Sequence, residues 1–189
     1  MIYSGPFEQI PLFRYNLIMA DPPWSYENYS KAGEAKNAKA HYDCMSLEEI
    51  KRMPVSQIAT PDSLLFLWVT NPMLDQGMEV LKAWDFNFCT AGHWSKRNPE
   101  TGKLAFGTGY VLRSAGEPFL IGTIGKPKTA KNIRSVIEGP RREHSRKPEE
   151  AYVAAENLIP DAKRIELFSR TPRAGWDTWG DEAEKFQAA

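Results

Sequence analysis

The sequence predicts an α/β fold with a mainly parallel sheet, and three features support that prediction. Apolar runs with the length of buried strands occupy residues 15–20, 63–69, 86–94, 119–124 and 164–169. Between some of them, apolar residues recur with helical spacing at 72–84 and 148–158. Strands that alternate with helices form parallel sheets, and ligands then bind outside the carboxyl ends of the strands.

The composition is that of one soluble globular domain covering residues 1–189. Hydrophobic residues make up 42% of the chain and charged residues 25%, and the formal net charge is zero. A neutral chain argues against binding driven by global charge but is compatible with a local basic patch. Two cysteines do not make a disulfide framework, and no run approaches the roughly 20 apolar residues of a membrane helix. Because the N-terminus also lacks a signal peptide, we expect a cytoplasmic protein.

The first predicted strand is followed by two prolines. The apolar run at 15–20 stops at Asp21-Pro22-Pro23-Trp24, because proline cannot continue a central strand. Residues 25–45 are polar and predict a long loop, a length typical of functional or mobile segments. The capping box at 46–49 predicts a short helix that ends at about Met53.

Later elements are expected from turn and helix signals. Pro72 lies near the first turn of the helix at 72–84, where a missing N–H is tolerated. Glu149 and Glu150 lie in the first turn of the helix at 148–158, where the helix dipole favours acidic groups. Loops or turns are expected at 95–110, at 126–147 around an apolar patch, and at 175–182.

The tetrapeptide Asp21-Pro22-Pro23-Trp24 has the groups that an amine-activating site needs. The exocyclic amine of adenine is a weak nucleophile, because its lone pair is delocalised into the ring. The Asp21 carboxylate and the Pro22 carbonyl can accept its two N–H bonds, and the prolines add no N–H of their own. Trp24 offers a face on which an extruded base stacks. The alternative interpretation is an ordinary turn after a strand.

Six motifs occur in the order found in a known family. They are MADPPW at 19–24, LFLWVT at 65–70, the pair Trp94 and Lys96, SRKPEE at 145–150, KRIELFSR at 163–170 and GWDTWG at 175–180. With these motifs the chain resembles the Asp-Pro-Pro-Trp adenine N-6 methyltransferases, the MT-A70-like family. That family includes the catalytic subunit of the eukaryotic messenger-RNA adenosine methyltransferase and small bacterial and phage relatives. The resemblance runs from about Tyr15 to Glu182.

The resemblance implies a Rossmann-like, S-adenosylmethionine-dependent methyltransferase fold in which the catalytic motif precedes the cofactor-binding strand. The catalytic site for the adenine amine would then be Asp21, Pro22, Pro23 and Trp24. The family residues beside the substrate correspond to Tyr42, Glu117 and Lys147. Those at the cofactor correspond to Asp21, Lys147, Glu166, Arg170, Asp181 and Glu182. The chain departs from the messenger-RNA enzyme at Asp181-Glu182, where that enzyme has two amides, and in a shorter segment at 171–173.

Three of these charged residues can also be interpreted from their local sequence. A carboxylate within an apolar strand, as at Glu166, is costly unless it is paired or exposed, and ribose hydroxyls are natural donors to it. A solvated glutamate at a sheet edge is the alternative, and Glu117 beside Pro118 has the matching alternative of a loop charge. Lys147 lies at a helix start, where the dipole disfavours a cation, so a nearby anion or a developing charge would explain it.

A basic segment suggests the contact with nucleic acid. Residues 126–147 contain eight lysines and arginines, Arg141 and Arg142 among them, against two glutamates. We interpret this run as a phosphate-contact surface, with a solvated loop as the alternative. Lys31, Lys36 and Lys39 could add a second contact. The histidines and cysteines match no zinc spacing, so no metal is expected.

The sequence therefore favours an adenine methyltransferase that uses S-adenosylmethionine and acts on nucleic acid. DNA is preferred to RNA because small stand-alone relatives resemble phage or bacterial DNA enzymes. A non-catalytic nucleic-acid-binding subunit is a second hypothesis, although such subunits typically have a degraded Asp-Pro-Pro-Trp motif. A protein methyltransferase acting on a glutamine amide is a third, but those enzymes carry Asn in place of Asp21. A homodimer and a separate partner subunit both stay open.

Overall fold

The computed structural model describes residues 6–25, 44–109, 111–142 and 146–180. In chain order its elements are β1 Tyr15–Ala20, α2 Leu47–Lys51, α3 Val55–Ile58, β2 Ala59–Trp68, the 3-10 helix η2 Asn71–Met73, α4 Leu74–Ala83, β3 Asn87–Arg97, β4 Gly116–Ile124, β5 Val136–Pro140, α5 Glu149–Leu158, β6 Arg164–Leu167 and β7 Trp176–Trp179. They form the α/β fold that the sequence predicts.

The strands form one seven-stranded sheet in the order β5-β3-β4-β2-β1-β6-β7. Strand β4 pairs antiparallel with both β2 and β3, and the other four pairings are parallel. The expectation of a mainly parallel sheet is therefore confirmed. The carboxyl ends of the six strands that share a direction lie at one edge of the sheet, together with the amino end of β4. We call this the carboxyl edge.

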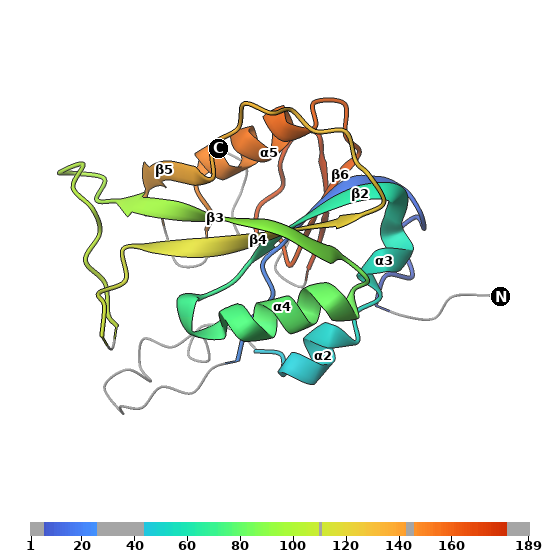
Figure 1. The fold of residues 1–189 in the computed structure, drawn as a ribbon, viewed down its shortest axis with the longest axis horizontal. Coiled ribbons are helices and arrows are strands. Elements are labelled where there is room, and N and C mark those ends of the chain that lie inside the picture. The colour runs from blue at the N-terminus through green and yellow to red at the C-terminus, as the bar shows by residue number, and fades with distance from the viewer. Residues whose placement is uncertain (1–5, 26–43, 110, 143–145, 181–189) are drawn as a thin grey trace.

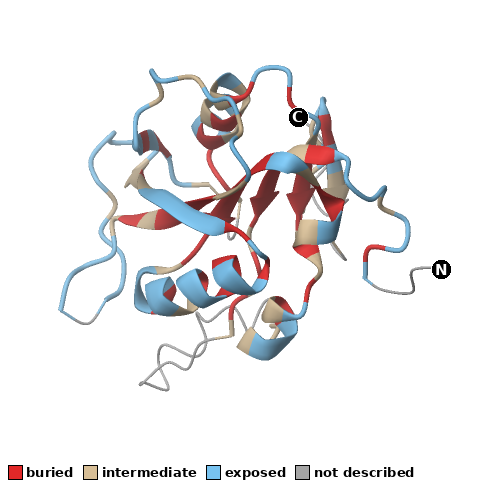
Figure 2. Ribbon diagram, turned by 45° about the vertical axis from the view of Figure 1, so that its right-hand side comes forward, coloured by how far each residue is buried: buried red, intermediate tan, exposed pale blue. Residues whose placement is uncertain are grey.

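Helices cover both faces of the sheet (Figure 1). Side chains of β1 and β2 alternate between the faces, as they must in an extended strand. Ile18 and Leu65 belong to the core cluster that includes α2, α3 and α4 residues, whereas Met19 and Phe66 belong to the cluster that includes α5 residues. The sheet interior is buried on both sides (Figure 2), which is why its central strands read as continuous apolar runs.

The same alternation places charged side chains on the α5 face of the sheet. Met19, Trp94 and Phe119 all pack in the cluster on that face. Asp21 and Lys96 come two residues after the first two, and Glu117 comes two residues before the third. Because side chains two residues apart in a strand share a face, all three lie on the α5 side at the carboxyl edge.

Several local signals are confirmed and three expectations are wrong. The Ser46 capping box is formed by both of its hydrogen bonds, and Pro72 lies in the first turn of η2. The loop expected at 95–110 begins later, because β3 extends to Arg97 by pairing with β4 and β5. The segment expected to be a loop at 126–147 contains β5, and the turn-rich tail contains β7. Strand β5 forms by pairing with β3, and β7 forms by pairing with β6. Composition does not reveal such pairing with a distant strand.

Candidate active site at the carboxyl edge

Backbone hydrogen bonds hold the Asp21–Trp24 loop in place. The Asp21 N–H donates to the carbonyl of Leu167 at the end of β6, at 3.4 Å. The Trp24 N–H donates to the Pro22 carbonyl at 2.8 Å, and the Met45 N–H donates to the Pro23 carbonyl at 3.0 Å. A carbonyl oxygen has two lone pairs, so Pro22 can still accept one more hydrogen bond, as its expected role requires.

Trp24 does not have the stacking role that the sequence suggests. Its side chain is only 4% exposed and packs in the core cluster on the α4 side. Its indole N–H donates to the carbonyl of Trp68, at 3.1 Å. Trp24 therefore ties the loop after β1 to the end of β2, and its ring faces are covered by core residues and not open to a base.

A buried lysine joins the two carboxylates of the site. Lys147 Nζ lies 2.9 Å from Asp21 Oδ2 and 2.9 Å from Glu117 Oε2, and its side chain is 7% exposed. Lys96 Nζ lies 2.5 Å from Glu117 Oε1. Two carboxylates explain why a cation is stable immediately before helix α5, where the dipole alone would oppose it. Asp21, Glu117 and Lys147 are separate candidates in the sequence, and the structure brings them together.

The pairing sets the ionisation of these groups. Burial raises the pKa of Asp21, and the ammonium of Lys147 opposes that rise. Burial would also raise the pKa of Glu117, but Lys147 and Lys96 together lower it to about 2. Burial alone would lower the pKa of Lys147, yet the two carboxylates raise it above its ordinary value. The site thus holds an ionised Glu117, a charged Lys147 and an Asp21 that is a strong hydrogen-bond acceptor.

Lys96 and two tryptophans lie at the site, although no sequence motif indicated a role for them there. Lys96 Nζ lies 4.7 Å from the ring centroid of Trp94, and Lys147 Nζ lies 5.0 Å from that of Trp68. Aromatic faces stabilise a poorly hydrated cation and fix its position. The alternation in β3 could have revealed Lys96, because it shares a face with the buried Trp94.

Glu166 is buried, and each of its carboxylate oxygens accepts a hydrogen bond from the chain. It is 6% exposed, and it lies on β6 opposite Met19 of β1. The Tyr152 hydroxyl donates to Glu166 Oε1 at 2.7 Å, and the Ser169 hydroxyl donates to Oε2 at 2.9 Å. The alternative of a solvated edge glutamate is therefore wrong. Each carboxylate oxygen keeps further acceptor capacity, because it has more than one lone pair.

The remaining candidates divide between the carboxyl edge and undescribed segments. Burial raises the pKa of Asp21, and the charges of Lys147 and, to a smaller extent, Arg170 lower it, in agreement with the position of Arg170 after β6 at the carboxyl edge. The Arg141 N–H donates to the Arg97 carbonyl at 2.8 Å, so exposed Arg141 and half-buried Arg142 follow β5 at the same edge. Tyr42, Asp181 and Glu182, together with Lys31, Lys36 and Lys39, lie outside the described residues.

The basic run at 126–147 does not form one surface, as its continuity in sequence suggested. Lys126 follows the carboxyl end of reversed β4, and its N–H donates to Asp62 near the amino end of β2. The Ala130 N–H donates to the carbonyl of Leu158 at the end of α5. Strand β5 then crosses to the carboxyl edge, where Arg141 follows it. Among the described residues of the run, those that follow β5 lie at the same edge of the sheet as Asp21.

Unused polar atoms lie next to Asp21 at the end of β2. Trp68 Nε1 and Thr70 Oγ1 are buried and have no hydrogen-bond partner in the described part of the chain. Buried polar groups normally have partners, so this edge has capacity for a bound molecule. Among the same residues no group of three histidines, cysteines or acids could hold a metal ion, and no helix is long and apolar enough to cross a bilayer.

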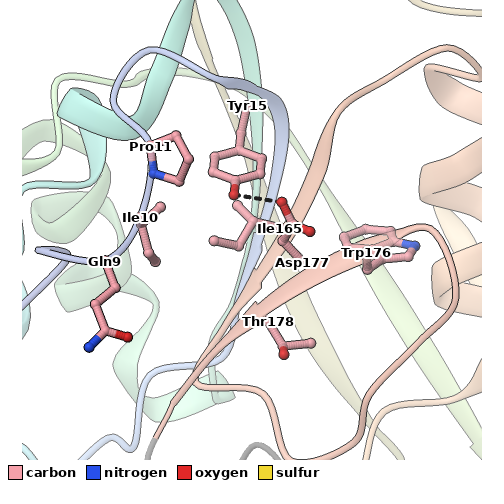
Figure 3. Close-up of a pocket in the computed structure, with 8 residues that line it drawn as sticks. All are labelled: Gln9, Ile10, Pro11, Tyr15, Ile165, Trp176, Asp177 and Thr178. Carbon is pink, nitrogen blue, oxygen red and sulfur yellow. Dashed lines mark hydrogen bonds between the residues drawn. The ribbon is translucent and has the colours of Figure 1, made fainter.

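A separate hollow of about 380 Å³ lies at the opposite end of β1 (Figure 3). There the Tyr15 hydroxyl donates to Asp177 Oδ2 of β7, at 2.7 Å. Tyr15 begins β1 and Asp21 follows its end, so the strand separates this hollow from the cluster of charged side chains. We therefore place the candidate active site at the carboxyl edge.

Comparison with known proteins connects this geometry to a family. The MT-A70 family matches residues 15–182. The chain is 30% identical to the type II methyltransferase M.MunI of a Mycoplasma species, over 93% of this chain and 81% of that protein. It is 33% identical to the Arabidopsis thaliana N(6)-adenosine-methyltransferase MT-A70-like protein, over 89% of this chain and 24% of that protein. It is 27% identical to the human N(6)-adenine-specific methyltransferase METTL4, over 94% of this chain and 40% of that protein. The protein thus belongs to the MT-A70 family.

Proposed function

We propose that the protein transfers a methyl group from S-adenosylmethionine to the exocyclic amine of adenine in DNA. The observation that carries this proposal is the position of Asp21. Its partly buried carboxylate lies at the carboxyl edge of the mainly parallel sheet, where ligands bind, and Lys147 contacts one of its oxygens. Membership of the MT-A70 family and the names of the relatives support the same reaction.

Asp21 and Pro22 would activate the adenine amine. S-adenosylmethionine supplies a methyl group made electrophilic by its positively charged sulfur. Asp21 accepts one N–H of the amine, and the free lone pair of the Pro22 carbonyl accepts the other. Both bonds localise the lone pair on nitrogen. As the carbon–nitrogen bond forms and the sulfur–methyl bond breaks to leave a neutral thioether, the amine proton would become acidic, and Asp21, whose pKa burial raises, can take it.

Lys147 and Glu117 would hold Asp21 in this role. Lys147 limits the rise in the pKa of Asp21, so that the carboxylate can stay ionised in a buried site. Glu117 pairs with Lys96 and also with the ammonium of Lys147, so it would keep that ammonium in place beside Asp21. Two lysines and two carboxylates are formally neutral, so a cationic sulfur meets no excess of positive charge here.

The residues at the carboxyl edge fit S-adenosylmethionine. Glu166 is a buried acceptor for ribose hydroxyls, and it lies one strand away from Asp21. Trp68 Nε1 and Thr70 Oγ1, which have no hydrogen-bond partner among the described residues, lie on the other side of β1. We also assign Arg170 to this cofactor region, because its charge acts on Asp21.

Arg141 and Arg142 would contact the nucleic-acid backbone, since they follow β5 at the same edge as Asp21. We favour DNA because the chain spans 81% of M.MunI, a type II methyltransferase, but only 24% of the Arabidopsis adenosine methyltransferase. The chain also spans 40% of human METTL4, whose name specifies adenine and not adenosine.

The test is methyl transfer from labelled S-adenosylmethionine to single-stranded DNA, duplex DNA and RNA, followed by nucleoside mass spectrometry. We expect N-6-methyladenine in DNA, and its appearance in RNA alone would correct the substrate. Asp21→Ala should abolish turnover while cofactor binding is largely kept. Asp62→Asn, at the opposite edge, serves as the control and should keep full activity. Cofactor binding by the wild type without any methylated product would favour the non-catalytic hypothesis or a missing partner.

A further inference from the structure

The two oxygens of the Glu166 carboxylate each accept a hydrogen bond from a neutral hydroxyl group. Tyr152 donates to one oxygen at 2.7 Å, and Ser169 donates to the other at 2.9 Å. The three residues come from different places: β6, helix α5 and the turn after β6. Such an arrangement fixes the rotamer of the carboxylate from two sides, while each oxygen keeps a lone pair for a further donor.

Tyr152 is itself fixed by packing and by an ion-pair network. Its ring meets Trp176 edge to face, with centroids 5.7 Å apart, and the guanidinium of Arg173 lies 4.8 Å from its centroid. Arg173 in turn pairs with Glu149 and Glu156, which lie two turns apart on α5. The hydroxyl of Tyr152 is therefore held in position independently of Glu166.

Ser169 is positioned by a strained turn at the end of β6. Phe168, directly before it, has φ of 62°, a conformation that non-glycine residues seldom adopt. The Ser169 N–H donates to the Trp179 carbonyl at 3.0 Å, and the side chain is 1% exposed. This turn brings a hydroxyl back toward a carboxylate three residues earlier. Backbone strain of this kind persists only where the surrounding structure enforces it.

We propose that Tyr152 and Ser169 are positioning residues that hold Glu166 as a fixed, ionised acceptor for the two ribose hydroxyls of the methyl donor. The inference rests on the proposed function, because it assigns a task to the cofactor region of that site. A vicinal diol presents two O–H donors, and an ionised carboxylate is an acceptor through both of its oxygens. A protonated Glu166 would instead spend one oxygen on its own O–H group.

The charged surroundings of Glu166 make this arrangement dependent on pH. Burial raises the pKa of Glu166, the two hydroxyl bonds oppose the rise, Asp21 from β1 adds to it, and Lys147 before α5 reduces it. Removal of one hydroxyl therefore raises the pKa further. If S-adenosylmethionine binds the ionised form of Glu166, binding is complete above the pKa of Glu166 and is lost as the pH falls through it. In a variant that lacks one hydroxyl, this loss therefore occurs at a higher pH than in the wild type.

The experiment is isothermal titration calorimetry of the 189-residue chain with S-adenosylmethionine between pH 5.5 and 8.5. We compare the wild type with Tyr152→Phe, Ser169→Ala, Glu166→Gln and the double variant Tyr152→Phe/Glu166→Gln. We expect each hydroxyl deletion to weaken binding about tenfold at pH 7, with recovery at higher pH. Glu166→Gln should bind weakly at every pH, and adding Tyr152→Phe to it should change nothing further.

Tyr15→Phe is the matched control, because it also removes a tyrosine O–H bond of 2.7 Å to a carboxylate, at the other end of β1. The affinity of Tyr15→Phe for S-adenosylmethionine should have the same pH profile as that of the wild type. Thermal unfolding of each variant establishes that it is folded. Wild-type binding together with an unshifted profile in Tyr152→Phe and Ser169→Ala would overturn this inference alone. Failure of the wild type to bind S-adenosylmethionine at any pH would overturn the proposed function as well.

Discussion

Replacing Lys147 by methionine tests whether the buried ion pairs hold the site together. Methionine has a similar length and is uncharged, so the substitution removes the ammonium with little change in packing. Asp21 loses its Lys147 contact and Glu117 loses one of two, while the 2.5 Å contact from Lys96 to Glu117 is kept. The variant leaves Asp21 buried without that cation.

The expected cost follows from these contacts. Breaking a buried ion pair costs about 3–5 kcal/mol, and a hydrogen bond to a charged group contributes about 1.5–3 kcal/mol. The Asp21 and Glu117 side chains are 22% and 25% exposed, and Glu117 keeps a partner, so the lower end applies. A loss of about 3 kcal/mol corresponds to a fall in Tm of about 6–12 °C for a chain of this size. The pKa of Asp21 should also rise, because the carboxylate loses the ammonium that opposes the effect of burial.

The assay combines thermal unfolding at pH 7 with initial methylation rates from pH 6 to 9. Lys147→Met should unfold at a lower temperature, and its residual activity should increase toward alkaline pH as Asp21 ionises. Lys51→Met is the matched control, because Lys51 also pairs with two carboxylates, those of Glu48 and Glu79, on the exposed helix surface. Its Tm and pH profile should match the wild type. A Lys147→Met protein that behaves like this control would refute the reasoning.

Three further predictions concern nucleic-acid contact, the core and acid stability. Replacing Arg141 and Arg142 by glutamine should weaken DNA binding and reduce the slope of log K against log salt by about 2 in a salt titration. Replacing Lys126, Lys128 and Lys131, which lie toward the opposite edge, by glutamine should leave this slope unaltered. Trp24→Phe keeps a ring but loses the bond to Trp68, so Tm should fall by about 3–6 °C, whereas a stacking role predicts an unchanged Tm. Glu117 stabilises the fold above pH 4.5 and loses that effect as the pH falls toward 2, so Glu117→Gln should remove about 3 kcal/mol of acid-sensitive stability in denaturation curves collected at several pH values.

The sequence was sufficient wherever the signal is local. A run of apolar residues that stops at two prolines placed Asp21 at the end of a buried strand, and the structure confirms that strand as β1. The capping box located the start of α2 to the residue, because its hydrogen bonds join atoms three positions apart. Buried parallel strands are continuously apolar, so the central strands were also visible from composition.

Local signals misled where the decisive partner is distant in the sequence. Trp24 follows a candidate catalytic motif, which suggested a stacking face, but the carbonyl that binds its indole belongs to Trp68. Strands β5 and β7 contain too few apolar residues to be recognised alone, and they form because β3 and β6 offer unpaired edges. The basic run at 126–147 looked continuous, yet β5 places its two halves at opposite edges.

The sequence by itself determined the alternation of elements, the strand that presents Asp21 and the family motifs that name the chemistry. Only the tertiary structure decided that Asp21, Lys96, Glu117 and Lys147 form one cluster. Their proximity depends on the reversal of β4, which brings the start of that strand to the edge where the other strands end. Strand direction is chosen by packing and pairing across the whole sheet, and such long-range interactions leave no signature in a local stretch of residues.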